Sequence, residues 1–196
     1  MTNGIDCGPP ADQWWTSITP VNLVIDFPPL VGVINALFYA EIREAGTQVP
    51  ATVIDVDDAF AVDIHLELNV VSPLQNLLCG FWCISLCLES LCDDYDYRFP
   101  RDSTDPPGYC CLLVPFNCNT TYDATICVPG GIVKESECGS AYEGTIIVTL
   151  LSACKRPSAP PDCDPADPGC YIPAGAAGSF QLPLLTFYDD TGGVGE

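Results

Sequence analysis

Cysteines are the residues of this 196-residue chain that are most able to do chemistry, and there are thirteen of them. Because thirteen is an odd number, at least one thiol cannot pair within the chain. The chain contains no C-x-x-C and no C-x-x-C-H motif, so the common zinc, redox and c-type haem spacings are absent. We therefore interpret the cysteines as disulfide partners.

The sequence leaves the pairing of these cysteines open. Cys110 and Cys111 are adjacent, and in a strand they point to opposite faces, so we expect them to reach different partners. Cys7 lies on an N-terminal arm and is the first candidate for a bridge between subunits. The candidate disulfide cysteines are Cys79, Cys83, Cys87, Cys92, Cys110, Cys111, Cys118, Cys127, Cys138, Cys154, Cys163 and Cys170.

His65 is the single histidine, and it lies between Asp63 and Glu67 in an alternating segment. Any mechanism with an imidazole base would rest on this one residue. Its position on the polar side of the segment is typical of a surface histidine, and no G-x-S-x-G motif is present. We expect no catalytic residues and no enzyme activity.

A cluster of aspartates is the candidate metal site. Asp55, Asp57 and Asp58 precede the best strand, and carboxylate oxygens are the ligands that calcium prefers. The alternative is a solvated turn in which the side chains cap the backbone. No other cofactor is expected. Asn119 begins an N-x-T sequon and is a candidate glycosylation site if the chain is exported.

The charge balance excludes several partners. Asp and Glu number 26 against six Lys and Arg, and a surface so negative repels nucleic acid and anionic lipid. No run of about 20 apolar residues is present to insert into a membrane as a helix. Disulfides suit an extracellular or cell-surface location, although residues 1–7 do not resemble a secretory signal peptide. An intracellular location in a thermophile and a virion are the alternatives.

Alternation with a period of two predicts strands. From Phe60 to Val70 the even positions are apolar and the odd ones are small or polar, which predicts a strand buried on one face. Phe81 to Glu89 alternates in the same way, so we prefer a strand to a helix in Leu74–Cys92. Ile34–Ala45 has the same ambiguity. Further strands are expected in Val21–Phe27, Pro50–Val56, Cys110–Phe116, Ala124–Val128, Thr145–Leu151 and Phe180–Tyr188.

These elements predict an all-β protein, a disulfide-rich antiparallel sandwich of the immunoglobulin-like or jelly-roll type. Residues 1–20 would form an N-terminal arm and residues 21–154 the sandwich. Residues 155–179 hold many prolines and glycines and would be an irregular tether. Residues 180–196 would then supply a terminal strand and tail, which could add to its own sheet or to a neighbour's.

Together, these features favour a structural protein that assembles with itself into an extracellular filament, sheath or coat. The expected docking residues, besides Cys7, are Trp14, Trp15, Leu182, Leu184 and Phe187. The alternative is a secreted or surface binding module, dependent on calcium or carbohydrate. A coat component of a virion would differ mainly in forming a closed shell instead of an open polymer.

Overall fold

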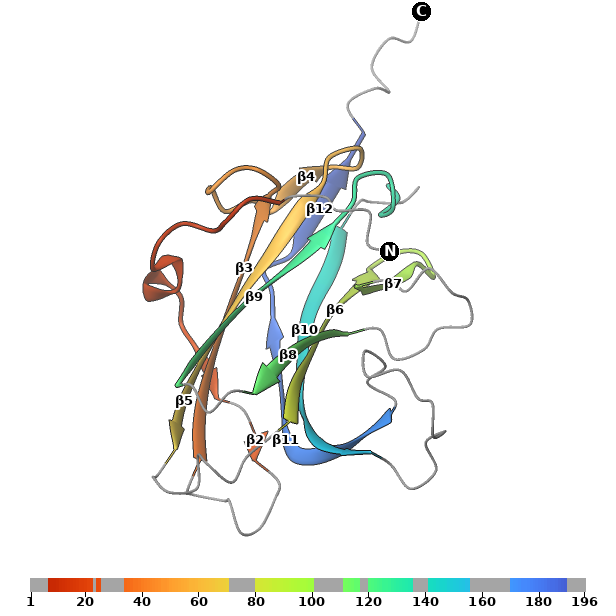
Figure 1. Cartoon of the computed structure of the whole chain (residues 1–196). Helices are drawn as coiled ribbons and strands as arrows, with labels where there is room; N and C mark the ends of the chain where they lie inside the picture. The colour runs from red at the N-terminus through yellow and green to blue at the C-terminus, as the bar shows by residue number, and fades with distance from the viewer. Residues whose placement is uncertain are drawn as a thin grey trace, which may run out of the picture.

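The computed structural model describes residues 7–22, 24–25, 34–70, 80–100, 111–116, 120–135, 141–155 and 170–189. These residues form two β-sheets and one short 3-10 helix, η1 (Trp14–Ser17), so the expected all-β class is confirmed. Figure 1 shows the long strands of both sheets running along the molecule. Within the described residues, no helix is long and apolar enough to cross a membrane.

The smaller sheet, sheet A, contains four antiparallel strands in the order β1-β3-β5-β9. Its two longest strands pair from Ile34 opposite Val70 to Glu44 opposite Phe60. The β9 strand then pairs along β5, with Asp123 opposite His65 and Cys127 opposite Ala61. The strands of sheet A are β1 (Val21–Asn22), β3 (Ile34–Glu44), β5 (Phe60–Val70) and β9 (Thr121–Val128).

The larger sheet, sheet B, is built around β10 (Ala141–Lys155). On one side β10 pairs with β6 (Gly80–Ser90), which in turn pairs with β7 (Asp96–Phe99) and β8 (Leu112–Phe116). On the other side β10 pairs with two strands that follow one another along the chain and are flanked by two short strands. These are β11 (Tyr171–Gln181), β12 (Leu185–Tyr188), β2 (Val24–Ile25) and β4 (Val53–Asp55), of which only β4 is parallel to its neighbour β12.

One hydrophobic core joins the inner faces of the two sheets. Aromatic rings meet across it, with centroids 5.7 Å apart for Phe38 and Phe180 and 5.6 Å apart for Phe60 and Phe187. The even positions of β5 supply the core from sheet A, and Trp82, Ile84, Leu86 and Leu88 supply it from β6. Alternation therefore identified the inner faces correctly, and both long ambiguous segments, β3 and β6, are strands.

The other face of β5 differs from the expectation of a polar, solvated surface. Ala61, Asp63 and His65 on that face are at most 2% exposed, because the chain before β1 lies across them. Period-two alternation separates the two faces of a strand, but it does not tell whether the polar face meets water.

The proline- and glycine-rich segment also differs from the expectation, since its last part is the strand β11 (Tyr171–Gln181). The ladder between β10 and β11 shifts register on either side of the pair Leu151 and Pro173. A proline has no N–H to donate, so it is tolerated where a ladder is irregular. The composition of this segment therefore did not prevent strand formation.

Candidate functional site

An N-terminal arm, residues 7–20, covers the outer face of sheet A (Figure 1). A disulfide between Cys7 and Cys127 of β9 fixes its start, with 6.0 Å between the two Cα atoms. The carbonyl of Cys7 also accepts a hydrogen bond from the N–H of Gly46 at 3.0 Å. The arm is therefore held covalently to one strand of sheet A and by hydrogen bonds to the loop after β3.

Arg43 on β3 also holds the first residues of the arm, Cys7 and Gly8. Its guanidinium pairs with Asp63 on the neighbouring strand and donates to the carbonyls of Cys7 at 2.7 Å and Gly8 at 2.8 Å. Asp63 accepts a further hydrogen bond from the hydroxyl of Thr125 at 2.7 Å. Arg43 and Asp63 are each 2% exposed, and a buried ion pair is tolerated only when such additional hydrogen bonds satisfy both partners.

His65 lies under the second part of the arm. The indole of Trp15 stacks on the imidazole with ring centroids 3.9 Å apart and planes inclined by 10°. The imidazole Nδ1 lies 2.6 Å from Oδ1 of Asp123, and Nε2 lies 3.5 Å from Oε1 of Glu67. Burial, followed by the charge of Glu67, raises the pKa of neighbouring Tyr39.

These contacts make His65 a support for the arm instead of the surface histidine that was expected. Its ring is covered on one face by Trp15 and Nδ1 lies against Asp123, while Nε2 is buried near Glu67 without a hydrogen-bond partner. The polar residues of the outer face thus do structural work in holding the arm.

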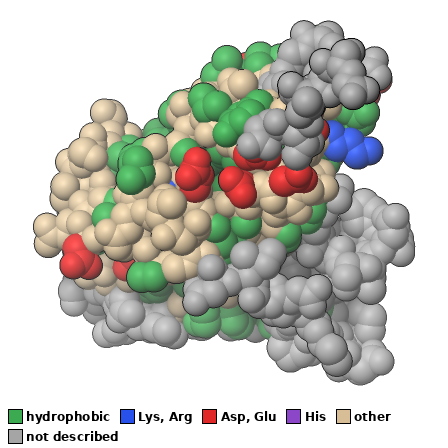
Figure 2. Space-filling model, turned by 90° about the horizontal axis from the view of Figure 1, so that it is seen from above, with side chains coloured by type: hydrophobic (Ala, Val, Ile, Leu, Met, Phe, Trp, Pro, Cys, Tyr) green, Lys and Arg blue, Asp and Glu red, His purple; other side chains and the backbone are tan. Residues whose placement is uncertain are grey.

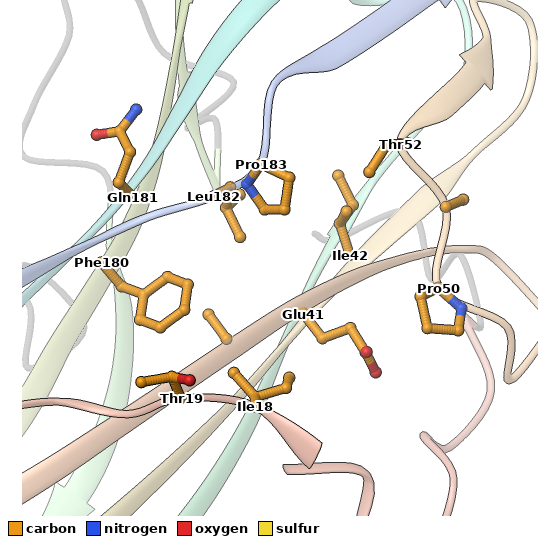
Figure 3. A pocket seen from close by; sticks show the side chains of 12 residues that line it. Ile18, Thr19, Glu41, Ile42, Pro50, Thr52, Phe180, Gln181, Leu182 and Pro183 are labelled. Carbon is orange, nitrogen blue, oxygen red and sulfur yellow. The ribbon is translucent and has the colours of Figure 1, made fainter.

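A pocket opens between the sheets beside the arm (Figure 3). It has a volume of about 430 Å³ and is formed mainly by apolar side chains. Ile18 and Thr19 at the end of the arm form one wall, and the segment from Pro50 to Thr52 forms the opposite wall. The remaining lining residues are Ala40, Glu41 and Ile42 of β3 and Phe180, Gln181, Leu182 and Pro183 from β11 and the turn after it. This volume is within the usual range for small-molecule sites, about 300–1,000 Å³.

The outer face of sheet B is different in character from that of sheet A. On its three central strands, three adjacent rows of three side chains carry no charge. We call these nine residues the sheet B grid: Cys87, Thr145 and Gln181 in one row, Ser85, Ile147 and Ser179 in the next, and Cys83, Thr149 and Ala177 in the third. The β11 members are exposed, and Arg98 borders the grid by donating to the Ser85 hydroxyl at 3.4 Å.

The structure places the expected disulfide cysteines as follows. Cys83 is bonded to Cys111, Cys127 is bonded to Cys7, and Cys92 and Cys170 are also disulfide-bonded. Cys87 differs from the expectation because it carries a free thiol, and burial raises the pKa of that thiol. Cys79, Cys110, Cys118, Cys138 and Cys163, together with the side chain of Cys154 and the candidate glycosylation residue Asn119, lie outside the described residues.

Most of the expected docking residues lie within the chain's own fold. Cys7 is bonded to Cys127 and is 3% exposed, so in this arrangement it bridges no subunits. Trp14 and Leu182 are buried, and Phe187 is 1% exposed in the core because β12 pairs with β10 and β4. Besides Trp15, which is partly covered on His65, only Leu184 of this set is exposed, at 53%.

The aspartates proposed for calcium form a tight turn between β4 and β5. Oδ1 of Asp55 accepts a hydrogen bond from the N–H of Asp57 at 2.9 Å, and its carbonyl accepts one from Asp58 at 3.1 Å. In the part of the chain that the structure describes, no three His, Cys, Asp or Glu side chains converge to hold a metal ion. The alternative interpretation, a turn capped by its own side chain, describes this geometry.

The sequence contained partial signals for the arm and the pocket. Two adjacent tryptophans before the first strand, and an arginine inside an apolar strand, were both unusual for exposed positions. The pocket had no such signal, because its walls come from four separate segments of the chain. No protein-family model, curated protein or solved structure matches this chain.

Proposed function

We propose that this protein is a self-assembling structural subunit of an extracellular filament, sheath or coat, with copies of itself as its partners. The observation that carries the proposal is the uncharged sheet B grid on a chain with a net charge of −20. Two copies repel one another wherever acidic surfaces meet, so close contact is cheapest where charge is absent. Depletion of charged residues is also the compositional mark of interface centres.

Covalent stapling supports the same proposal. A chain of this size with 48% hydrophobic residues buries a sizeable core without help, yet disulfides tie the arm to β9 and β6 to the segment before β8. Such surplus stapling is usual in proteins that persist in oxidising surroundings outside the cell. The two sheets that share one core support the β-sandwich that we propose for this chain, an architecture common in coat and cell-surface proteins.

The test is the assembly state of the untreated protein, by negative-stain electron microscopy and sedimentation velocity at low and high salt. We expect polymers that become more abundant with salt, because salt screens the repulsion between acidic copies. Thr149→Glu would place a charge in the grid and should shift the population to single chains. Thr121→Glu adds the same charge at an exposed position on sheet A and should leave assembly intact.

Two outcomes would contradict the proposal at different levels. Isolated particles of 21.0 kDa at every salt concentration would overturn self-assembly itself. Polymers that persist unchanged in Thr149→Glu would overturn the grid as their contact surface while leaving self-assembly in place.

A secreted or surface binding module is the second candidate function. The specific observation that favours it is the apolar pocket between the arm, β3 and the turn after β11. A calcium-dependent form of this function would have to rest on the Asp55–Asp58 turn, whose first carboxylate already caps the backbone.

A further inference from the structure

We propose that the pocket beside the arm binds the aliphatic chain of a small amphiphile whose head group is an amine. This inference rests on the second candidate function, the binding module, and does not depend on whether the chain polymerises. Three features support it: the apolar floor of the pocket, the carboxylate at its rim, and the negative charge of the chain.

The floor accepts only apolar groups. It is formed by Ala40, Ile42, Phe180 and Leu182, which are all at least nine-tenths buried by neighbouring residues, and by Pro183. Two backbone groups of these residues are already paired, since the N–H of Leu182 donates to the carbonyl of Gly144 at 2.8 Å and the carbonyl of Ile42 accepts from the N–H of Ala51 at 3.0 Å. A polar head group placed against these apolar side chains would lose hydrogen bonds to water.

The pocket is a single gap between mainly apolar walls. Figure 3 shows the labelled side chains arranged around one gap, with Phe180 and Ile18 on one side and Pro50 and Thr52 on the other. Gly144 keeps the floor closed, because a Cβ on it would come within 2.9 Å of Leu182 Cδ1. The cavity is thus bounded by packed side chains and opens at the rim.

The rim carries one carboxylate, that of Glu41, on the strand that forms the floor. Burial, followed by the nearby charge of Asp63, raises the pKa of Glu41, while Arg43 acts in the opposite direction. The Arg43 guanidinium is occupied by Asp63 and by the carbonyls of Cys7, Gly8 and Thr47. Glu41 is therefore a partly desolvated acid whose ionised form a ligand cation would stabilise.

The surrounding charge disfavours the opposite class of ligand. Fatty acids also have an aliphatic chain, but their carboxylate would meet Glu41 and a chain with a net charge of −20. Figure 2 shows acidic side chains spread among hydrophobic ones at the end of the molecule seen from above. A cationic head group is attracted by this field, and a carboxylate is repelled.

The experiment compares three probes that share a ten-carbon chain: decylamine, 1-decanol and decanoate. Binding is measured by isothermal titration calorimetry near pH 7.5, below the concentrations at which the probes aggregate. We expect decylamine to bind tightest, decanol to bind about fivefold more weakly, as suits a partly exposed ion pair, and decanoate to show no saturable binding.

A substitution at the rim and a matched control outside the pocket separate the pocket from the general acidic surface. Glu41→Gln should weaken decylamine binding about fivefold and leave decanol binding unchanged, because it removes only the ion pair. Glu44→Gln removes the same charge from an exposed position on the same strand and should leave both affinities unchanged. The affinity for decylamine should also fall as the pH drops through the raised pKa of Glu41, since the protonated acid has no charge to offer.

A third substitution tests the apolar wall. Ile18→Ser changes a partly exposed residue of the arm that packs against the edge of the core, and it should weaken decylamine and decanol alike. Equal losses of decylamine binding in Glu41→Gln and Glu44→Gln would show unspecific attraction to the acidic surface and would overturn the inference. Equal binding of decanol and decylamine, both weakened by Ile18→Ser, would keep the binding module and overturn the amine. Failure of all three probes to bind would overturn both the binding module and its amine ligand.

Discussion

The two outer faces of this molecule contrast in what lies on them and in what covers them. The outer face of sheet A carries an arginine, an aspartate and a histidine that are each 2% exposed, because the arm lies across them. On the outer face of sheet B the nine residues of the sheet B grid are uncharged and their β11 members are open to solvent, whereas the next row carries the exposed Glu89 and Glu143. The charged residues under the arm are thus covered, and the uncharged grid is open along β11.

This difference has a physical reason. An ion pair under the arm is stabilised by geometry, since Arg43 pairs with Asp63 and also donates to three backbone carbonyls, those of Cys7, Gly8 and Thr47. On the sheet B grid the corresponding contact is a single hydrogen bond at 3.4 Å from Arg98 to the Ser85 hydroxyl, and the β11 members of the grid are exposed. The two faces therefore call for different experiments, one on stability and one on association.

The largest effect is expected from breaking the Arg43 contacts. Arg43→Met leaves the Asp63 carboxylate buried beside Thr125 and removes the donor from the carbonyls of Cys7 and Gly8. We expect a loss of about 3–5 kcal/mol in the free energy of unfolding, the usual cost of removing one partner of a buried ion pair. Urea denaturation measures it. A loss below 1 kcal/mol would mean that the arm does not depend on this residue.

The next largest effects are expected from removing the two disulfides, one on each outer face. Cys7 and Cys127 are 120 residues apart and Cys83 and Cys111 are 28 apart. Loop-closure entropy predicts a contribution of about 5 kcal/mol for the first and about 3.5 kcal/mol for the second. Replacing both cysteines of each pair with alanine and measuring denaturation should give losses in that order. The reverse order would show that the arm is held mainly by its noncovalent contacts.

Local patterns of the sequence located the strands well. The alternation in Phe60–Val70 and Phe81–Glu89 identified β5 and β6 and their inner faces, because burial of one face of a sheet imposes that period on the chain. The failures concern contacts across the chain. Arg43 meets Asp63 across 20 residues, and Asp123 meets His65 across 58, so no local pattern announces either contact.

Composition was a weaker guide than periodicity. The prolines and glycines of the C-terminal third suggested an irregular tether, yet Tyr171–Gln181 is a strand because β10 offers a long ladder and tolerates a register shift at Pro173. The same error made Leu182 and Phe187 appear free to dock on a neighbour, whereas they complete the core. The pocket could not be foreseen, since its walls depend on where this strand turns beside β3.

The smallest expected effect comes from a substitution that distinguishes the two faces directly. Ala177→Lys changes an exposed alanine of the sheet B grid, and we expect the free energy of unfolding to change by no more than about 0.5 kcal/mol, as at most surface positions. Ala61→Lys makes the identical change on sheet A, at a position that is 0% exposed and lies opposite both Arg43 and Cys127. An ammonium there would be desolvated beside a buried guanidinium, so that variant should lose several kcal/mol of its free energy of unfolding or fail to fold.

If the two variants unfold at the same urea concentration, the arm does not seal the outer face of sheet A in solution, and the contrast between the faces fails. If Ala177→Lys alone is strongly destabilised in polymers but not in single chains, the sheet B grid is covered by another copy, which joins the stability experiment to the assembly proposal.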